Sequence, residues 1–235
     1  PVLEAGYPVT DPLVAPVSAR EDTLARLALP SGHRFVLYAP TWRDSQQVGH
    51  WQFDFDLQLD LVKVAAALAP DQILLLRGHH LVSTGLQDLT LPANVRDVSH
   101  VDDASELCAI ADVLITDYSS IFFDYATTGR PILFYCYDLE HYAEQVRGFY
   151  LDMAQDLPGP IARSTEELVA LLADLPAVQA THADRYAAFR ERFCALNDGS
   201  AAERVVDAFF GPFPSRSRFL SDLVALAGNG PAEDD

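Results

Sequence analysis

Short apolar runs alternate with stretches of helical spacing from residue 35 to residue 147, and this alternation limits the possible folds more than any other feature. The apolar runs predict strands at 35–39, 73–76, 95–98, 113–115 and 132–135. The stretches between them predict helices at 57–69, at 104–111, in the second half of 113–128, and at 139–147. Strands and helices that alternate in this way build a parallel sheet with helices on both faces. The predicted fold class is therefore α/β, with a Rossmann-like parallel sheet.

The two ends of the chain have different patterns. Residues 1–20 contain four prolines and turn-forming residues, so we interpret them as an interdomain linker, followed by a short helix at 21–29. Residues 44–56 are expected to form a long loop. Further helices are predicted at 165–173, 182–195 and 200–210. We therefore expect one domain at 21–210, and a C-terminal helix with an acidic tail at 211–235.

The composition excludes several classes of partner. The net charge is −18, with 34 acidic and 16 basic residues, which argues against nucleic acid. No run reaches the roughly 18 apolar residues of a membrane span, and we find no signal peptide. Cys108, Cys136 and Cys194 lie too far apart for a metal cluster or a disulfide framework, which suits a reducing, cytoplasmic setting and gives no reason to expect a metal or cofactor. The chain opens on Pro1 without an initiator methionine, so we expect a fragment or an excised domain.

The stretch from Val113 to Asp124 joins a predicted strand to a predicted helix through a turn of small polar residues. Asp117, Ser119 and Ser120 can each serve as the N-cap of that helix. A helix that starts after a strand and such a turn presents free backbone N–H groups to an anion. Asp124 falls one helical turn after Ser120. A well-capped turn without any ligand explains this stretch equally well.

Two basic groups also follow predicted strands. Arg43 lies just beyond the strand at 35–39, and Arg77-Gly78-His79-His80 follows the strand at 73–76. Ligands of open α/β sheets bind at the carboxyl ends of the strands. Adjacent histidines point to opposite sides of an extended chain, so Arg77 with one histidine suits a phosphate better than a metal. Each group has a simpler interpretation, namely a surface ion pair for Arg43 and Asp44 and a surface polar group for His80.

Several motifs together closely resemble the CDP-glycerol glycerophosphotransferase family, whose members build teichoic acids and related glycerol-phosphate polymers. The motifs that carry the resemblance are Tyr38 to Asp44, Arg77-Gly78-His79, Leu114 to Asp124, Arg147-Gly148-Phe149-Tyr150, and Asp156-Leu157-Pro158-Gly159-Pro160. Gly6-Tyr7-Pro8 with Asp11 resembles the family's linker motif, although Val9 and Thr10 replace an arginine and an asparagine. The resemblance runs from about residue 6 to about residue 210.

The resemblance implies a GT-B fold, in which two Rossmann-like domains face a cleft. This chain is similar to the C-terminal domain, which binds the nucleotide donor CDP-glycerol. The implied partners are an upstream N-terminal GT-B domain and an acceptor, either a glycerol-phosphate polymer or a lipid-linked acceptor. The full-length enzyme would then work in the cytoplasm, peripherally at the inner face of the cell membrane.

A pyrophosphate needs N–H donors and cations, and the candidate residues supply both. Ser119 and Ser120, with their backbone amides, provide donors, while Arg77 and Arg43 provide positive charge. This arrangement would hold the charged centre of a nucleotide donor. It would do so at the carboxyl edge of the predicted sheet.

The remaining roles come from the resemblance. It implies that Asp124 accepts hydrogen bonds from the ribose hydroxyls and that His79 is catalytic and stabilises the leaving phosphate. Asp117 is expected to orient the turn beside the substrate. The implied reaction is attack of an acceptor hydroxyl on the glycerol-bound phosphorus with CMP leaving, in teichoic acid-type or capsular polymer synthesis. The catalytic base is expected on the absent domain, so the isolated chain should be inactive.

Two alternatives stay open on the sequence. A GT-B transferase could use CDP-ribitol or a nucleotide sugar, because the region that would contact the donor's polyol, 79–84, does not reveal its specificity. A non-catalytic module that binds a CDP-linked compound would contain the same phosphate-binding residues. Restoration of activity by the upstream sequence distinguishes an enzyme from such a module.

Overall fold

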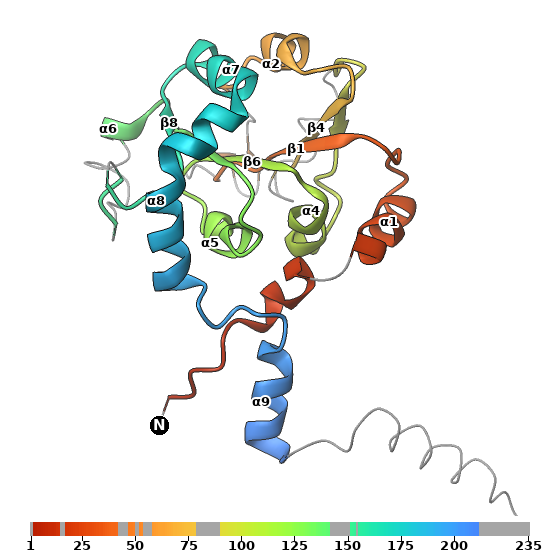
Figure 1. Ribbon diagram of the computed structural model, residues 1–235. Coiled ribbons are helices and arrows are strands. Elements are labelled where there is room, and N and C mark those ends of the chain that lie inside the picture. Colours follow the sequence, from red (N-terminus) through yellow and green to blue (C-terminus); the bar gives the residue numbers. More distant parts are fainter. Residues whose placement is uncertain are drawn as a thin grey trace, which may run out of the picture.

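A computed structural model describes residues 2–14, 17–41, 47–49, 52–53, 58–78, 90–141, 151–153 and 155–211. Its centre is a sheet of six parallel strands in the order β5-β4-β1-β6-β7-β8 (Figure 1). The strands are β1 (Arg34–Tyr38), β4 (Gln72–Leu76), β5 (Val95–Asp97), β6 (Val113–Thr116), β7 (Ile132–Tyr135) and β8 (Ile161–Ala162). The predicted α/β class is confirmed.

Helices cover both faces of this sheet, because its strands are apolar on both sides. In β1, Phe35 and Leu37 belong to one buried cluster, whereas Val36 and Tyr38 belong to the other. The first cluster packs under η1 (Pro8–Val14), α1 (Val17–Arg26), α4 (Ala104–Ile110) and α5 (Ile121–Ala126). The second packs under α2 (Leu61–Ala67) and α7 (Thr165–Ala173). The elements on the two faces lie on opposite sides of the sheet in Figure 1.

Helix α8 (Leu175–Phe193) joins the two faces. Val178 near its start is buried in the second cluster, and Phe189 near its end is buried in the first. The helix begins two turns earlier than the predicted 182–195, because the Asp174 carboxylate accepts a hydrogen bond from Ala177 N at 3.1 Å. Pro176 lies in the first turn, where a missing N–H costs nothing. Its middle turns therefore pass along the end of the sheet.

The N-terminal segment packs against the last described helix, α9 (Ala201–Phe210). Asp11 accepts hydrogen bonds from Ala201 N at 3.0 Å and Ala202 N at 2.8 Å, so it caps a helix 190 residues further along the chain. Gly6 has a positive φ of 80°, and a Cβ there would lie 2.3 Å from the backbone oxygen of Leu196. These contacts explain the Gly6 and Asp11 of the linker motif. The role of residues 1–20 as an interdomain linker stays a prediction.

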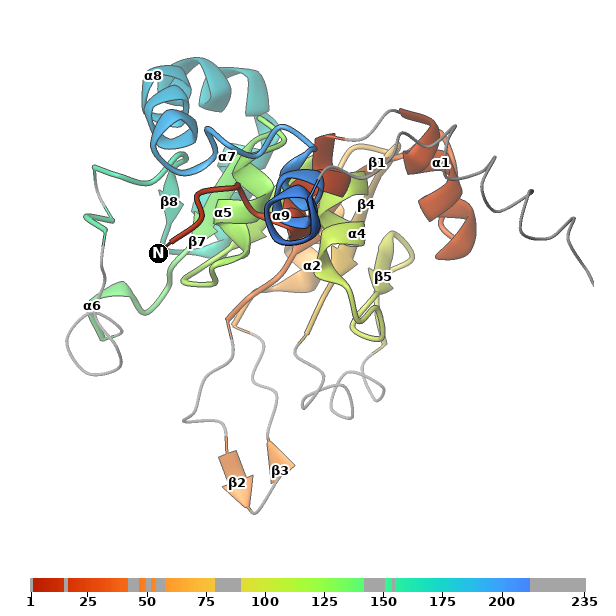
Figure 2. The same cartoon turned by 90° about the horizontal axis from the view of Figure 1, so that it is seen from below.

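Several predicted boundaries need correction. Helix α1 begins at Val17, not at 21, and α2 is shorter than 57–69 because the Asp60 side chain caps it through Lys63 N at 3.0 Å. The region predicted as a loop at 44–56 contains two short antiparallel strands, β2 (Gln47–Gly49) and β3 (Gln52–Phe53). Figure 2 shows this pair standing away from the sheet beyond the end of β1.

Other predictions are met only in part by the described residues. Helix α6 is described as Leu139–His141, and the rest of the predicted 139–147 lies outside the described residues, as does all of 212–235. Strand β8 was not predicted, because it has two residues and is set by its partner, with Phe134 N donating to Pro160 O at 2.9 Å. Among the helices that the structure describes, none is both long and apolar enough to cross a membrane.

The motif at 156–160 has a structural reason of its own. A Cβ on Gly159 would lie 1.9 Å from the backbone oxygen of Ile132, so only glycine lets these two segments approach. Pro160 then pairs with Phe134 and starts β8 beside β7. The motif therefore lies at the amino end of β7, which is the edge of the sheet opposite the predicted site.

Candidate functional site

The strand order reverses beside β1, and this point is where open α/β sheets bind ligands. In order along the chain the strands are arranged 3-2-1-4-5-6, so the crossover lies between β1 and β6. The carboxyl ends of β1, β4 and β6 meet at this edge, and in Figure 2 the chain leaves β1 and β4 toward the bottom of the view. The segments that follow these three strands carry most of the predicted site residues.

Asp117 fastens the turns after β1 and β6 to each other. Its Oδ1 accepts hydrogen bonds from Thr41 N at 2.7 Å and Tyr118 N at 2.6 Å, and the residue is 2% exposed. One residue earlier, Thr116 Oγ1 donates to Ala39 O at 2.7 Å. Asp117 thus orients the turn, as expected, but it does not cap α5.

Ser119 and Ser120 lie at the start of α5, and neither hydroxyl makes a strong capping bond to the helix. Ser119 Oγ accepts from Ile121 N at 3.4 Å, which is long for a hydrogen bond. Ser120 holds the N-cap position without a side-chain capping bond, because its φ of −63° and ψ of −10° are helical instead of extended. Helix α5 has only six residues, so its dipole is short. An anion here would depend on hydroxyls and backbone amides more than on the dipole.

Arg77 enters the same edge from β4. Its backbone N donates to Tyr38 O at 2.9 Å, and its Nη2 donates to Asp102 O at 3.3 Å. The Nε atom is buried and has no hydrogen-bond partner among the described residues. A buried donor without a partner is costly, so this guanidinium is suited to an anion from outside the chain. Next to it, Gly78 N donates to Ser99 Oγ at 2.8 Å, which fixes the backbone.

Asp124 is a half-buried carboxylate on α5 with no side-chain partner in the part of the chain that the structure describes. Burial raises its pKa above the ordinary value, because a charged carboxylate loses solvation there. Burial also raises the pKa of the Cys108 thiol to about 12, with Asp124 raising it further and Arg77 lowering it.

Tyr118 and Asp138 also lie at this edge and were not predicted as site residues. Tyr118 OH donates to Asp138 Oδ1 at 2.9 Å, which links the turn after β6 to the segment after β7. Both residues follow the carboxyl end of a strand, so the rule that selected Arg77 and Arg43 could have found them. Their bond holds the serine turn from the side opposite Arg77.

Two predicted residues cannot be placed. Arg43 and His79, with His80 beside it, lie outside the described residues. The other predicted residues follow two strands of the same edge: Arg77 comes after β4, and Asp117, Ser119, Ser120 and Asp124 come after β6, the last of them on α5. The described residues hold no group of three or more His, Cys, Asp or Glu side chains arranged for a metal ion.

Comparison with known proteins agrees with the geometry. Residues 1–211 match the family described as CDP-Glycerol:Poly(glycerophosphate) glycerophosphotransferase. A teichoic acid poly(glycerol phosphate) polymerase from Staphylococcus epidermidis is 40% identical over 88% of this chain and 29% of its own length. A teichoic acid glycerol-phosphate transferase from Staphylococcus aureus is 36% identical over 89% of this chain and 54% of its own length.

A solved structure gives the same result. The wall teichoic acid polymerase TagF superposes with a TM-score of 0.76 at 37% identity, over 96% of this chain and 52% of that chain. Another TagF structure was obtained after a soak with CDPG. The chain spans about half the length, or less, of these relatives. On this match of sequence and fold, the chain belongs to the CDP-glycerol:poly(glycerophosphate) glycerophosphotransferase family.

Proposed function

We propose that this chain is the donor-binding half of an enzyme that transfers glycerol phosphate from CDP-glycerol to an acceptor hydroxyl, with CMP leaving. The observation that carries the proposal is the carboxyl edge at β1, β4 and β6. At this edge the buried Arg77 Nε has no hydrogen-bond partner among the described residues, and the turn at 117–120 follows β6. The names of the relatives specify glycerol phosphate, which favours a CDP-glycerol donor.

Each residue has a role that its surroundings support. The pyrophosphate lies against the hydroxyls of Ser119 and Ser120 and against the Arg77 guanidinium. Asp117 acts through the backbone, because its Oδ1 already holds two amides. Asp124 accepts hydrogen bonds from the ribose hydroxyls. These bonds replace the solvation that its carboxylate loses by burial, since it has no side-chain partner among the described residues.

The reaction that follows is an in-line displacement at phosphorus, which depends on positioning and on neutralisation of charge. Arg77 and the serine turn stabilise the charge that develops on the leaving CMP. We assign Arg43 to the same pyrophosphate and His79 to the leaving phosphate, where one electrostatic donor contributes about 10²–10³ in rate. The base for the acceptor hydroxyl belongs to the preceding domain of a GT-B enzyme, and the enzyme acts in the cytoplasm, peripherally at the inner face of the membrane, in teichoic acid or capsule synthesis.

The direct test is Arg77→Ala. We expect the wild-type chain to bind CDP-glycerol, and we expect the variant to lose about tenfold or more of that affinity while its affinity for cytidine stays unchanged, because Arg77 contacts phosphate and not the nucleoside. Isothermal calorimetry with both ligands measures the difference. Arg96→Ala is the matched control and should leave both affinities unchanged. Arg96 lies on β5, and its guanidinium donates to Ala93 O at 2.7 Å. Equal losses of both ligands in Arg77→Ala would contradict the assignment.

Asp124→Asn should increase stability and weaken binding. The pKa of Asp124 is higher in the folded chain than in the unfolded chain, so ionisation of Asp124 destabilises the fold. This destabilisation is complete above the folded-state pKa and absent below the unfolded-state pKa. The variant should therefore resist urea better than the wild type at pH 7, and the difference should shrink as the pH falls through that window. Its affinities for CDP-glycerol and for cytidine should both fall by about tenfold, because both ligands contain the ribose. A variant that binds as well as the wild type would remove Asp124 from the site.

A further inference from the structure

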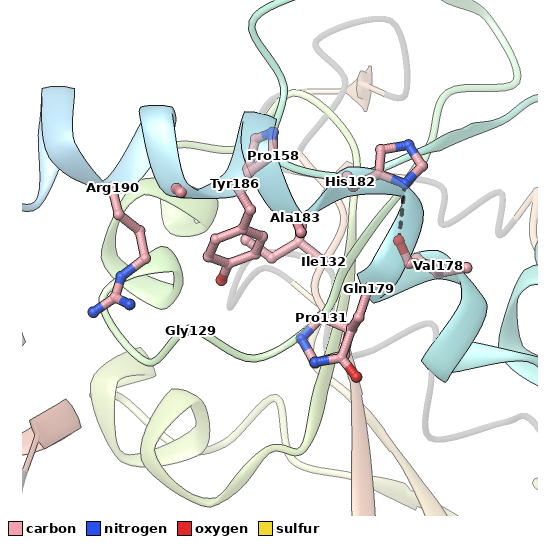
Figure 3. A pocket seen from close by; sticks show the side chains of 12 residues that line it. Gly129, Pro131, Ile132, Pro158, Val178, Gln179, His182, Ala183, Tyr186 and Arg190 are labelled. Atoms are coloured by element: carbon pink, nitrogen blue, oxygen red, sulfur yellow. Dashed lines mark hydrogen bonds between the residues drawn. The ribbon is translucent and has the colours of Figure 1, made fainter.

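A hollow of ≈ 270 Å³ lies at the amino edge of the sheet, opposite the donor site. Its walls are α8 on one side and, on the other, the turn at 129–132 and the Pro158-Gly159 segment (Figure 3). The Pro158-Gly159 segment belongs to the family motif that the donor site does not use. The hollow is slightly smaller than the roughly 300–1,000 Å³ of most small-molecule sites, so it suits a short segment of a chain better than a nucleotide.

The hollow exists because α8 passes from one face of the sheet to the other. Its middle turns lie against the turn that precedes β7, where Tyr186 OH donates to Arg130 O at 2.7 Å. These turns contribute Gln179, His182, Tyr186 and Arg190 to the lining, at helical spacing. In Figure 3, Gln179, Tyr186 and Arg190 extend from α8 toward the turn at 129–131. Gln179 and Arg190 are eleven residues apart, or about 16 Å along the helix.

The charge in the lining of this hollow is positive. Among the described residues that line it, Arg190 is a cation and none is a carboxylate, although the chain as a whole has a net charge of −18. His182 Nδ1 lies 2.9 Å from Val178 O, so this nitrogen donates, which leaves Nε2 as the ring nitrogen for a ligand hydroxyl. Arg190 donates from Nη2 to Thr127 O at 3.3 Å, a long contact with a neutral group.

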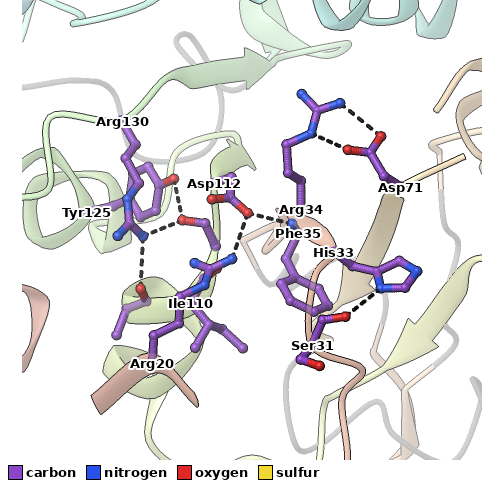
Figure 4. Close-up of polar contacts among 12 residues, drawn as sticks. Arg20, Ser31, His33, Arg34, Phe35, Asp71, Ile110, Asp112, Tyr125 and Arg130 are labelled. Atoms are coloured by element: carbon purple, nitrogen blue, oxygen red, sulfur yellow. Dashed lines mark hydrogen bonds and ion pairs between the residues drawn. The ribbon is translucent and has the colours of Figure 1, made fainter. Parts of the chain in front are cut away.

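Other arginines at this edge are already used by the fold (Figure 4). Arg34 forms two bonds with Asp71, at 2.8 and 3.0 Å. Arg130 Nη1 donates to the carbonyls of Ala109 and Ala111 at the end of α4, and Arg20 is paired with Asp112 at 2.9 Å. Arg34 and Arg20 are paired with carboxylates, and Arg130 holds two carbonyls at 2.8 and 2.6 Å, whereas among the described residues Arg190 has one long carbonyl contact and no carboxylate partner.

We propose that this hollow holds a short segment of polyol phosphate chain, namely the polymer end of the acceptor or product, away from the catalytic edge. The proposal rests on the proposed function, which supplies a polymer of phosphodiesters and hydroxyls. Arg190 binds a phosphodiester, Gln179 and His182 bind glycerol hydroxyls, and Pro131, Ile132 and Pro158 contact the methylene groups. A polyanion is repelled by an acidic protein, so it binds where the described lining offers a cation and no carboxylate.

The test uses a synthetic glycerol phosphate tetramer and the whole chain. Binding is measured by calorimetry at low salt, and contacts are located by amide chemical shifts of Gly129, Arg130 and Ile132 and along α8. Arg190→Gln should weaken tetramer binding by about tenfold, and Gln179→Lys, which adds a second cation, should strengthen it by a similar factor. Arg192→Gln is the matched control, because this side chain is 61% exposed on the same helix and outside the hollow.

CDP-glycerol binding separates this proposal from the proposed function. Arg77→Ala should leave tetramer affinity unchanged, and Arg190→Gln should leave CDP-glycerol affinity unchanged. A wild-type chain that binds the tetramer but not CDP-glycerol contradicts the proposed function and leaves the polymer site standing. The proposed polymer site is contradicted if the tetramer does not bind, or if Arg190→Gln and Gln179→Lys bind it equally well. It is also contradicted if Arg77→Ala, instead of Arg190→Gln, loses tetramer affinity.

Discussion

Replacing Gly159 with alanine is expected to lower the free energy of unfolding by about 3 kcal/mol or more, or to prevent folding altogether. The added Cβ would lie 1.9 Å from the backbone oxygen of Ile132, and a backbone atom cannot rotate out of the way. Relief would require β7 to move, although Phe134 N is bonded to Pro160 O at 2.9 Å and Phe134 is fully buried. The measurement is the midpoint of urea unfolding.

Gly32→Ala is the control for this change. Gly32 has a positive φ of 73°, and a Cβ there meets nothing within 4 Å. Its substitution should cost about 1 kcal/mol, from backbone conformation alone. If the two glycine variants lose the same stability, the close approach at Ile132 does not govern the β7–β8 pairing.

Replacing both Ser119 and Ser120 with leucine should reduce CDP-glycerol affinity about 100-fold while the melting temperature changes little. Two hydroxyl donors are lost, each worth about 1 kcal/mol or more toward a charged group, and the larger side chains keep the pyrophosphate away from the amides of the turn. The fold should survive, because Ser120 is exposed and its side chain makes no capping bond.

Calorimetry measures the affinity, and circular dichroism measures the melting. Ser31→Leu, on an exposed turn outside the carboxyl edge, is the control and should keep the wild-type affinity. A folded double variant with unchanged CDP-glycerol affinity would show that the turn does not bind the pyrophosphate.

The strands and helices that the sequence predicted are those whose own residues show a clear apolar pattern. β1, β4, β6 and β7 are runs of four or five mostly apolar residues, and α7 was predicted at 165–173, where the structure has Thr165–Ala173. β8 could not be predicted, because two residues show no periodicity and their pairing is imposed by β7. The start of α8 was missed because only two of its residues, Val178 and Phe189, are buried, so its pattern is weak.

The sequence predicted where the candidate residues lie relative to the strands. It did not predict whether they are buried or hydrogen-bonded. Arg77 and Asp117 follow strands, so the sequence could place them at one edge. It could not show that Ser120 takes a helical conformation and leaves its hydroxyl without a capping bond. Nor could it show that Arg77 Nε is buried, or that Asp124 loses solvation, because burial depends on tertiary packing and not on the local sequence.

The cap that Asp11 places on α9 also sets an order of events during synthesis. The carboxylate and the two amides that it binds, at Ala201 and Ala202, are about 190 residues apart. A ribosome that adds about 5–20 residues per second needs about 10–40 s between them. Throughout that interval Asp11 has no helix to cap, and the segment around Gly6 lacks the Leu196 backbone against which it packs. The segment around Gly6 and Asp11 is therefore made well before its partner and reaches its final packing only when translation has passed α9.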